Sequence, residues 1–192
     1  MGLFFGIFVI IMIEQRKLLT RNEISVTIER LCHQLIENHD NFNNTIIVGV
    51  QPRGSLLSNR IISKLQSKLK KKKIESGNID ISFYRDDLRR RDSPIVPEAM
   101  DMNVSVEDKD VVLIDDVLYT GRSIRSALDA LMTFGRPRSV ELLTLINRRF
   151  SRHLPIQPNY VGRTIDILET EKVIVEWQEI NGNDRVLMVK SN

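Results

Sequence analysis

The sequence predicts an α/β protein whose mainly parallel central sheet is flanked by helices and followed by a C-terminal β-hairpin. Short runs of β-branched and apolar residues alternate with segments of helical periodicity along most of the chain. Two of these runs, at residues 45–50 and 111–114, are almost entirely apolar, as is typical of strands buried on both faces. Near the end of the chain, residues 173–180 and 185–190 flank Asn-Gly-Asn-Asp, which is a hairpin pattern.

The predicted elements follow one another in the order that such a sheet requires. Thr20 or Asn22 can cap a first helix, in which apolar residues recur at positions 24, 28, 31, 35 and 36. The strand at 45–50 leads through a basic turn into a second helix that ends near Leu69. Further along, the pattern predicts a strand at 79–84, a loop at 89–97, a helix over 121–134 and a strand at 139–146, followed by a basic loop at 147–153.

Length and composition indicate one globular domain. The chain has 192 residues, of which 42% are hydrophobic and 28% are charged, and both values are ordinary for a globular protein. The net charge of +3 is a mild bias that is compatible with a phosphorylated or nucleic-acid partner without requiring one. Cys32 is the single cysteine, so an intrachain disulfide is excluded, and we expect a reducing, cytoplasmic location.

The extreme N-terminus differs from the rest of the chain. Residues 3–13, LFFGIFVIIMI, are almost all apolar, but this run is shorter than the roughly twenty residues that span a bilayer. It also lacks the basic start and the small-residue cleavage site of a signal peptide. We therefore expect residues 1–13 to be an extension outside the fold, with translation beginning at Met12, and a weak interfacial anchor is the alternative. Residues 14–192 then form the single domain.

The strongest functional signal is VVLIDDVLYTGRS, at residues 111–123. The apolar strand runs into Asp115 and Asp116, and a Thr-Gly turn then opens the next helix, an arrangement that binds ligands at sheet edges. The two carboxylates could hold a metal, act as acid and base, or accept hydrogen bonds from vicinal hydroxyls. The backbone N–H groups of residues 118–123 could cradle a phosphate. Together these features favour a phosphorylated sugar as ligand over a purely structural loop and helix cap.

Neither GxxxxGK[ST] nor GxGxxG occurs in the sequence. The motif at 111–123 instead resembles the phosphoribosyl diphosphate (PRPP) motif of the type I phosphoribosyltransferases. The segments VGVQPRGSLL, IDISFYRDDL and LPIQPNYVGR are similar, in order and spacing, to the PyrR family, whose members are regulators of the pyrimidine operon and also uracil phosphoribosyltransferases. The resemblance covers residues 15–190. It implies the type I phosphoribosyltransferase fold, with a small hood over the site.

The resemblance also implies the reaction, in which uracil and PRPP give UMP and diphosphate, with Mg²⁺ bridging the diphosphate and ribose oxygens. The implied catalytic residues are Arg53, Arg85, Asp115 and Asp116. The two acids would bind the ribose hydroxyls and reach the metal only through PRPP and water. The residues implied in PRPP binding are Gln51, Pro52, Arg53, Gly54, Arg85, Asp115, Asp116, Val117, Leu118, Tyr119, Thr120, Gly121, Arg122 and Ser123. The loop through Arg91 would close over the diphosphate, and residues 147–163 would hold uracil.

Two positions bear on the base that is used. Tyr119 stands where purine transferases usually place an acid, which favours a pyrimidine. Residues 147–153, NRRFSRH, depart from the Asp-Arg-Gly-His that the resembled family commonly shows, and the loop looks one residue longer.

A second hypothesis is RNA binding, because in the resembled family a basic face of a dimer binds a messenger hairpin when uridine nucleotides occupy the active site. The candidate residues here are Arg30, His33, Arg148, Arg149, Arg152 and Arg163. Arg30 and His33 share one helix face, although Glu29 beside them would repel phosphate. The alternatives are an RNA-binding attenuator with vestigial catalysis, or a phosphoribosyltransferase for another base without RNA binding. We expect a homodimer or larger homo-oligomer and no membrane partner.

Overall fold

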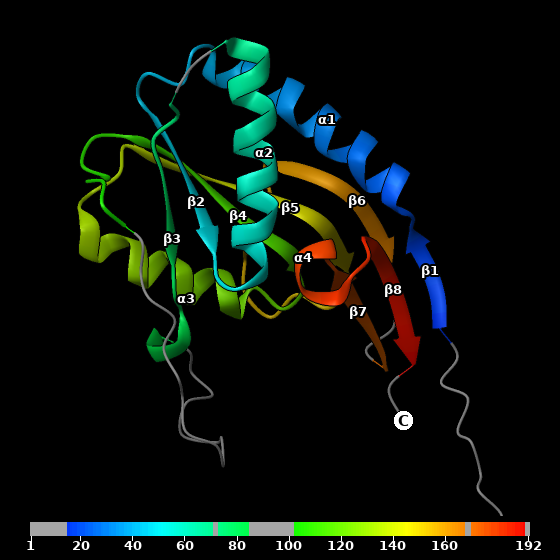
Figure 1. The fold of residues 1–192 in the computed structure, drawn as a ribbon. Helices are drawn as coiled ribbons and strands as arrows, with labels where there is room; N and C mark the ends of the chain where they lie inside the picture. The colour runs from blue at the N-terminus through cyan, green and yellow to red at the C-terminus, as the bar shows by residue number, and fades with distance from the viewer. Residues whose placement is uncertain (1–14, 71–72, 85–101, 168–169, 191–192) are drawn as a thin grey trace, which may run out of the picture.

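The computed structural model describes residues 15–70, 73–84, 102–167 and 170–190. The predicted extension at 1–13 lies outside these residues, as do Arg85 and Arg91 in the predicted diphosphate loop. The described chain forms a five-stranded parallel sheet with helices on both faces and a smaller antiparallel sheet beside it (Figure 1). This arrangement confirms the predicted fold class.

The parallel sheet has the strand order β3-β2-β4-β5-β6. Its strands are β2 (Thr45–Val50), β3 (Ser76–Ile79), β4 (Asp110–Leu118), β5 (Ser139–Arg149) and β6 (Tyr160–Asp166). β4 lies at the centre and pairs with β2 on one side and β5 on the other. Because the strands are parallel, the loops that follow β2, β4 and β5 all leave from the same edge of the sheet.

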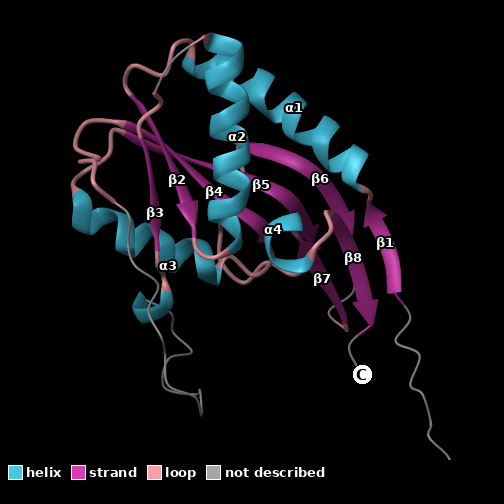
Figure 2. Ribbon diagram, viewed as in Figure 1, coloured by secondary structure: helices cyan, strands magenta, loops and turns pink. Residues whose placement is uncertain are grey.

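The helices cover the two faces of the parallel sheet unequally (Figure 2). Helices α1 (Arg21–His39) and α2 (Arg53–Leu69) pack on one face, and α3 (Arg122–Leu131) packs on the other. The side chains of β4 alternate between the two cores: Val112 and Ile114 face α1 and α2, whereas Val111 and Leu113 face α3. All four are fully buried, which explains the continuous apolar run that predicted this strand.

Helix α1 begins at the residue that the sequence pattern indicated. Thr20 is its N-cap: the Thr20 hydroxyl accepts a hydrogen bond from the Glu23 N–H, and the Glu23 carboxylate accepts one from the Thr20 N–H at 2.7 Å. This reciprocal pair is a capping box, which satisfies two backbone donors at the start of the helix.

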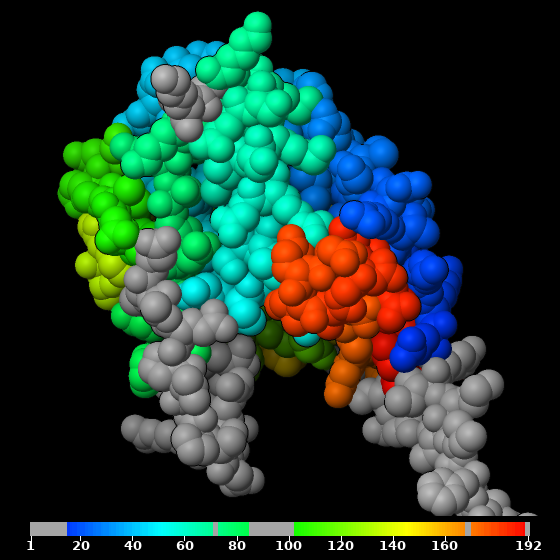
Figure 3. All heavy atoms as spheres, in the orientation of Figure 1, coloured from blue at the N-terminus to red at the C-terminus, as the bar shows by residue number. Residues whose placement is uncertain are grey.

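The antiparallel sheet has the order β1-β8-β7, with strands β1 (Gln15–Leu19), β7 (Glu171–Glu176) and β8 (Arg185–Lys190). β7 and β8 are the predicted hairpin, and β1 from the start of the described chain adds a third strand. The short helix α4 (Gln178–Asn181) joins β7 to β8. Figure 3 shows this C-terminal segment packed against the cyan α2 and the blue N-terminal segment. Trp177, which is fully buried, belongs to the same core as α1 and α2.

Three predicted boundaries differ from the structure. The strand predicted at 79–84 ends at Ile79, and Ser82–Tyr84 form a 3₁₀ turn, η1, because the Asp80 carboxylate accepts a hydrogen bond from the Ser82 N–H at 2.8 Å. The basic loop predicted at 147–153 begins later, since β5 continues to Arg149 and pairs with β6 there. Residues 178–180, predicted as strand, form part of α4. A 3₁₀ turn, η3 (Met132–Phe134), completes the helix predicted over 121–134.

No helix within the described ranges is long and apolar enough to cross a membrane.

Candidate functional site

The loops after β2 and β4 meet at the carboxyl edge of the parallel sheet. Gly49 of β2 lies opposite Ile114 of β4, so the turn that follows β2 lies beside the two acids of β4. A cavity of about 360 Å³ opens between them. It is lined by Val50, Gln51, Pro52, Arg53, Ile81, Asp115, Asp116, Val117 and Ser123. Two segments that are about sixty residues apart in the sequence therefore share one cavity.

Asp115 and Asp116 lie inside β4, which continues to Leu118, rather than after its end. Both carboxylates are buried, and the Asp115 Oδ1 atom accepts a hydrogen bond from the Asp116 N–H at 2.9 Å. The Thr144 hydroxyl of β5 accepts a hydrogen bond from the Leu118 N–H at 3.2 Å. This bond holds the last residue of β4 against β5. Neither Thr144 nor the cavity residue Ile81 carries a functional signal in the sequence, because β-branched side chains of this kind are common in strands.

Asp116 is the electrostatically unusual group of the cavity. It is only 8% exposed, and within the described part of the chain its Oδ2 atom has no hydrogen-bond partner. Burial raises the pKa of Asp116 from 3.8 to about 6, although the positive charge of Arg53 opposes the shift. A buried acceptor without a donor is unfavourable by itself, and it becomes favourable when a ligand supplies the donor.

Gly54 allows the turn after β2 to lie directly against β4. A Cβ atom at this position would stand 2.4 Å from the Ile114 carbonyl oxygen and 3.1 Å from the Asp115 Cα atom. Both neighbours are backbone atoms in the centre of the sheet and cannot move aside. The close approach that places Arg53 beside the acids therefore requires glycine.

A second cavity, of about 240 Å³, is formed by the loop between β4 and α3. It is lined by Asp115, Val117, Leu118, Tyr119, Thr120, Gly121, Arg122, Ser123 and Ile124. Gly121 has a φ of +90°, a left-handed conformation that favours glycine, and it precedes the first turn of α3. The N-cap residue Gly121 has no side chain that could cap the helix, and the Thr120 hydroxyl of the same loop accepts a hydrogen bond from the Arg122 N–H at 3.4 Å. The geometry suits an anion such as a phosphate.

The loop between β5 and β6 lies against this second cavity. The N–H groups of His153 and Leu154 donate to the Thr120 carbonyl oxygen at 3.0 and 3.2 Å. Residues 147–150, 152, 155–158 and 161 line a further cavity of about 470 Å³, in the segment where the uracil site was expected. The structure thus places the expected base segment beside the expected phosphate loop.

The six residues expected to contact RNA fall into different environments. Arg148 is 3% exposed, so it does not belong to an accessible surface and we leave it out of the RNA set. Arg163 in β6 and Arg30 in the neighbouring helix α1 are exposed. Both also donate hydrogen bonds to backbone carbonyl oxygens, Arg30 to Val161 and Gly162, and Arg163 to Leu18.

The other three also have partners within the chain. Arg149 forms a bidentate pair with Asp166, with both distances at 2.6 Å. Exposed His33 lies 3.7 Å from Glu29, and the half-buried Arg152 donates to the Asn147 side chain at 2.7 Å. The structure therefore shows a mixed, partly neutralised basic surface rather than a continuous patch.

Asp115 and Asp116 are the candidate metal-binding groups at this edge of the sheet. No cluster of three or more His, Cys, Asp or Glu side chains that could hold a metal occurs in the described ranges. Asp115 and Asp116 supply carboxylate oxygens, the donor type that Mg²⁺ prefers, and Asp116 Oδ2 has no partner there. These residues fit a Mg²⁺ that takes most of its ligands from a substrate and water.

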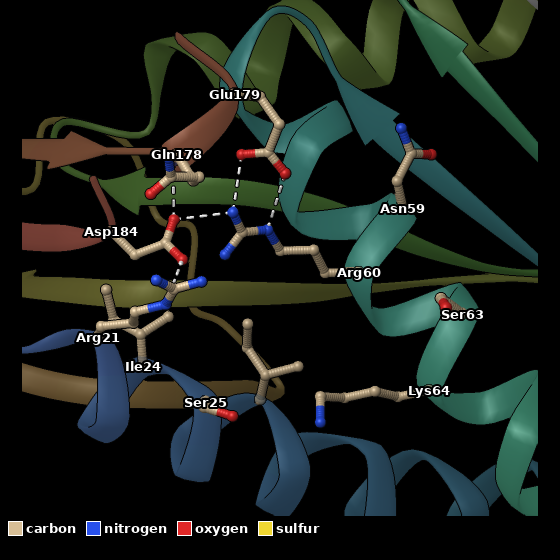
Figure 4. Close-up of a pocket in the computed structure, with 11 residues that line it drawn as sticks. Arg21, Ile24, Ser25, Asn59, Arg60, Ser63, Lys64, Gln178, Glu179 and Asp184 are labelled. Carbon is tan, nitrogen blue, oxygen red and sulfur yellow. Dashed lines mark hydrogen bonds and ion pairs between the residues drawn. The ribbon is translucent and has the colours of Figure 1, made fainter. Parts of the chain in front are cut away.

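A larger cavity, of about 610 Å³, lies away from this edge, between α1, α2 and α4 (Figure 4). Four of its five charged side chains are engaged with one another, and Lys64 instead donates to Glu29 at 3.1 Å. Arg60 donates to Glu179 at 2.7 and 3.1 Å and to Asp184 at 2.7 Å, while Arg21 lies 3.8 Å from Asp184. This network holds α4 against α2, and we assign the cavity a structural role.

The comparisons with known proteins agree with this geometry. The model of the phosphoribosyl transferase domain matches residues 14–179. The bifunctional protein PyrR of Clostridioides difficile is 39% identical over 175 residues, covering 91% of this chain and 98% of that protein. The bifunctional protein PyrR of Bacillus subtilis is 38% identical over 177 residues, covering 91% of this chain and 96% of that protein.

Solved structures show the same fold. A hypoxanthine phosphoribosyltransferase of Staphylococcus aureus superposes with a TM-score of 0.67 and 21% identity, covering 92% of each chain. A hypoxanthine phosphoribosyltransferase of Trypanosoma cruzi superposes with a TM-score of 0.68 and 19% identity, covering 93% of this chain and 92% of that one.

Proposed function

Because this chain belongs to the phosphoribosyl transferase domain family, and within it to the bifunctional PyrR proteins, we propose that the two cavities at the sheet edge bind PRPP. The chain is a pentosyltransferase that converts uracil and PRPP to UMP and diphosphate, and it is also a regulator of pyrimidine genes. The observation that carries the site assignment is the buried Asp116 carboxylate, whose Oδ2 atom lacks a donor among the described residues. A ribose has two neighbouring hydroxyl donors, and Asp115 and Asp116 offer two neighbouring acceptors.

The remaining parts of PRPP fit the surrounding loops. The 5′-phosphate would lie in the 240 Å³ cavity, against the backbone of residues 117–123 and the N-terminus of α3. The diphosphate would lie against Gln51, Pro52, Arg53 and Gly54, with Arg85 also reaching it. Arg53 would neutralise charge that develops on the leaving group. Mg²⁺, contacted by Asp115 and Asp116 through PRPP and water, would supply further neutralisation of the diphosphate.

Catalysis then rests on charge neutralisation and positioning. The bond from ribose to diphosphate breaks, with its electron pair leaving on the diphosphate and positive charge developing on the ribose ring. The uracil nitrogen forms the new bond and releases its proton to water. Asp115 and Asp116 hold the ring through its hydroxyls, and their negative charge favours the developing cation. Uracil would be held by residues 147–163, beside the phosphate loop.

For regulation, we propose that an RNA hairpin contacts Arg30, His33, Arg149, Arg152 and Arg163 when a uridine nucleotide occupies the site. The support is the position of the exposed side chains of Arg30, Arg149 and Arg163 on or beside β6, together with the membership in the bifunctional PyrR proteins. The working form would be a homodimer or larger homo-oligomer in the cytoplasm.

The enzyme assignment is tested by incubating the purified protein with PRPP and Mg²⁺ and with either uracil or hypoxanthine. UMP should form with uracil, and hypoxanthine should give no nucleotide. Nucleotide formation from hypoxanthine alone would assign a different base and contradict the proposal.

The RNA assignment is tested with a stem-loop from the transcript leader of the host's pyrimidine genes and a scrambled RNA of equal length, each over a salt series. UMP should strengthen binding of the stem-loop but not of the scrambled RNA. Arg149→Ala should weaken it, whereas Arg185→Ala, which removes a half-buried arginine that is also paired with a carboxylate, should not. Binding that ignores UMP and sequence and collapses with salt would show only general attraction to phosphate.

A further inference from the structure

Tyr119 is held from two sides by arginines of β5 and of the loop after it. The Arg148 guanidinium lies over the Tyr119 ring, 3.9 Å from its centroid. The Arg152 guanidinium donates one hydrogen bond to the Tyr119 carbonyl oxygen and another to the Asn147 side chain at 2.7 Å. The ring and the backbone of Tyr119 are thus both fixed by residues from outside its own loop.

The burial of Arg148 shows that this contact is more than a surface association. Arg148 is 3% exposed, whereas the Tyr119 side chain that it covers belongs to a residue that is 37% exposed. Burial lowers the pKa of Arg148 from its ordinary value, which reflects the unfavourable desolvation of a guanidinium. A cation over an aromatic ring is most favourable when it is desolvated in this way.

Thr120 and Gly121, which follow Tyr119, also contact the loop after β5. Thr120 accepts hydrogen bonds from the His153 and Leu154 N–H groups. A Cβ atom at Gly121 would lie 3.3 Å from the Ile156 side chain, so the left-handed turn itself packs against the loop after β5. Three consecutive residues, 119–121, are therefore each held by the segment 148–156.

We propose that Arg148 and Arg152 are positioning residues that clamp Tyr119 and thereby hold the backbone of residues 120–123 in the conformation that receives the 5′-phosphate of PRPP. The inference rests on the proposed function, because it assumes that this loop binds that phosphate. Since both arginines belong to the segment proposed to hold uracil, the clamp couples the base half of the site to the phosphate half. By linkage, each half then strengthens binding at the other.

The test compares variants in which the stacking pair is removed with variants in which it is kept. Arg148→Met and Tyr119→Leu each remove the stack, and Tyr119→Phe keeps the ring. Arg138→Met is the matched control, because Arg138 pairs with Asp110 at the opposite end of the sheet. For each protein, calorimetry measures PRPP binding in the presence of Mg²⁺, kinetics give KM and kcat, and thermal unfolding reports folding.

Loss of the stack should raise the Kd and KM for PRPP by roughly 5- to 30-fold, the range that a desolvated cation–π contact supports, while kcat stays within about twofold. Tyr119→Phe, which keeps the ring over which Arg148 lies, should raise the Kd for PRPP less than Tyr119→Leu does. The double variant Arg148→Met with Tyr119→Leu should be no weaker than either single variant, because both remove the same contact. Arg138→Met should leave the Kd for PRPP unchanged.

The outcomes separate this inference from the function on which it rests. If the original protein does not bind PRPP, the proposed function fails. If the original protein binds PRPP and Tyr119→Leu binds it equally well, the positioning role is overturned. A variant in which KM rises, kcat falls and the melting temperature falls together would also overturn it, because that result shows only a general folding defect. Should Arg148→Met fail to fold, the exposed Tyr119 still allows the test through Tyr119→Leu and Tyr119→Phe.

Discussion

Strand β4 carries acidic residues near both of its ends, and their carboxylates lie in opposite environments: one is fully hydrogen-bonded, and the other is buried with an oxygen left unpaired within the described part of the chain. At the amino end, the Asp110 carboxylate accepts hydrogen bonds from Arg138 Nε at 2.9 Å and from the Ser139 hydroxyl at 2.6 Å. The bond from Arg138 holds the pKa of Asp110 below its usual range. At the carboxyl end, burial raises the pKa of Asp116 to about 6, and its Oδ2 atom has no partner among the described residues.

The same contrast extends to the neighbouring strands. At the amino end of β5 and β6, the Tyr160 hydroxyl donates to Glu141 at 2.6 Å and accepts from the Asn38 side chain at 2.9 Å. At the carboxyl end, Arg149 and Asp166 form an ion pair, but Asp115 and Asp116 line a cavity instead. The polar groups at the amino end are thus satisfied within the fold, whereas the buried Asp116 Oδ2 atom at the carboxyl end has no partner in the described ranges, and under the proposed function a ligand supplies it.

The largest expected effect comes from neutralising the acids at the carboxyl end. Asp115→Asn combined with Asp116→Asn keeps the side-chain volumes but removes both negative charges beside the position proposed for the ribose. We expect kcat/KM for UMP formation to fall by about 10²- to 10³-fold, as when preorganised electrostatic groups are removed from other active sites. The measurement is the initial rate of UMP formation with uracil, PRPP and Mg²⁺.

Asp110→Asn is the matched control, because it makes the same chemical change on the same strand. It should leave kcat/KM within about twofold, since Asp110 contacts neither cavity. Equal losses in the two variants would mean that the two ends of β4 are not functionally distinct.

A smaller effect should appear in the pH dependence of stability. A carboxyl whose pKa rises on folding stabilises the folded state below its unfolded pKa near 3.9, and this contribution is lost as the pH rises through about 6. Without ligand or Mg²⁺, Asp116→Asn should therefore be more stable than the original protein at pH 8, by up to about 3 kcal/mol. Near pH 4 the difference should be much smaller. Urea unfolding at both pH values measures it, and a constant difference would contradict the buried-acid interpretation.

The smallest change in stability is expected for Asp110, the carboxylate that is already paired with Arg138. Asp110→Asn should destabilise the protein by about 1 kcal/mol near pH 7, because Arg138, the partner of Asp110, is largely exposed and well solvated. The sign of the pH dependence is reversed here: since the pKa of Asp110 is lowered on folding, its stabilisation is present above about pH 4 and is lost as the pH falls. A double-mutant cycle with Arg138→Met should show that the two losses are not additive. Full additivity would mean that the pair is not coupled.

The sequence predicted the parts of the fold that local patterns determine. The strand at 45–50 and the Thr20 cap agree with the structure, because an apolar run and a capping box are properties of neighbouring residues. That the loops after β2 and β4 serve one site was implied by the resemblance to the PyrR family, and both loops line one cavity in the structure. The resemblance to the PyrR family supplied the individual roles within it.

The remaining features depend on contacts between distant residues. IDISFY alternates like a strand, yet the strand that pairs with β2 is Ser76–Ile79, whose Ser-Gly-Asn composition has little strand preference. Arg148 was interpreted as an exposed charge, because nothing near it in the sequence indicates that it covers Tyr119. The addition of β1 to the C-terminal hairpin was equally invisible to local patterns.

That pairing of β1 with β8 constrains the order of folding. β8 is the middle strand of the antiparallel sheet and the only strand of that sheet that pairs with β1. Because β1 is made first and β8 last among the described strands, β1 has no partner until β8 has left the ribosome. The parallel sheet can form earlier, from segments made in succession. Trp177, the only tryptophan of the chain, is buried where this sheet joins the core, so its fluorescence would report the final closure separately from the folding that precedes it.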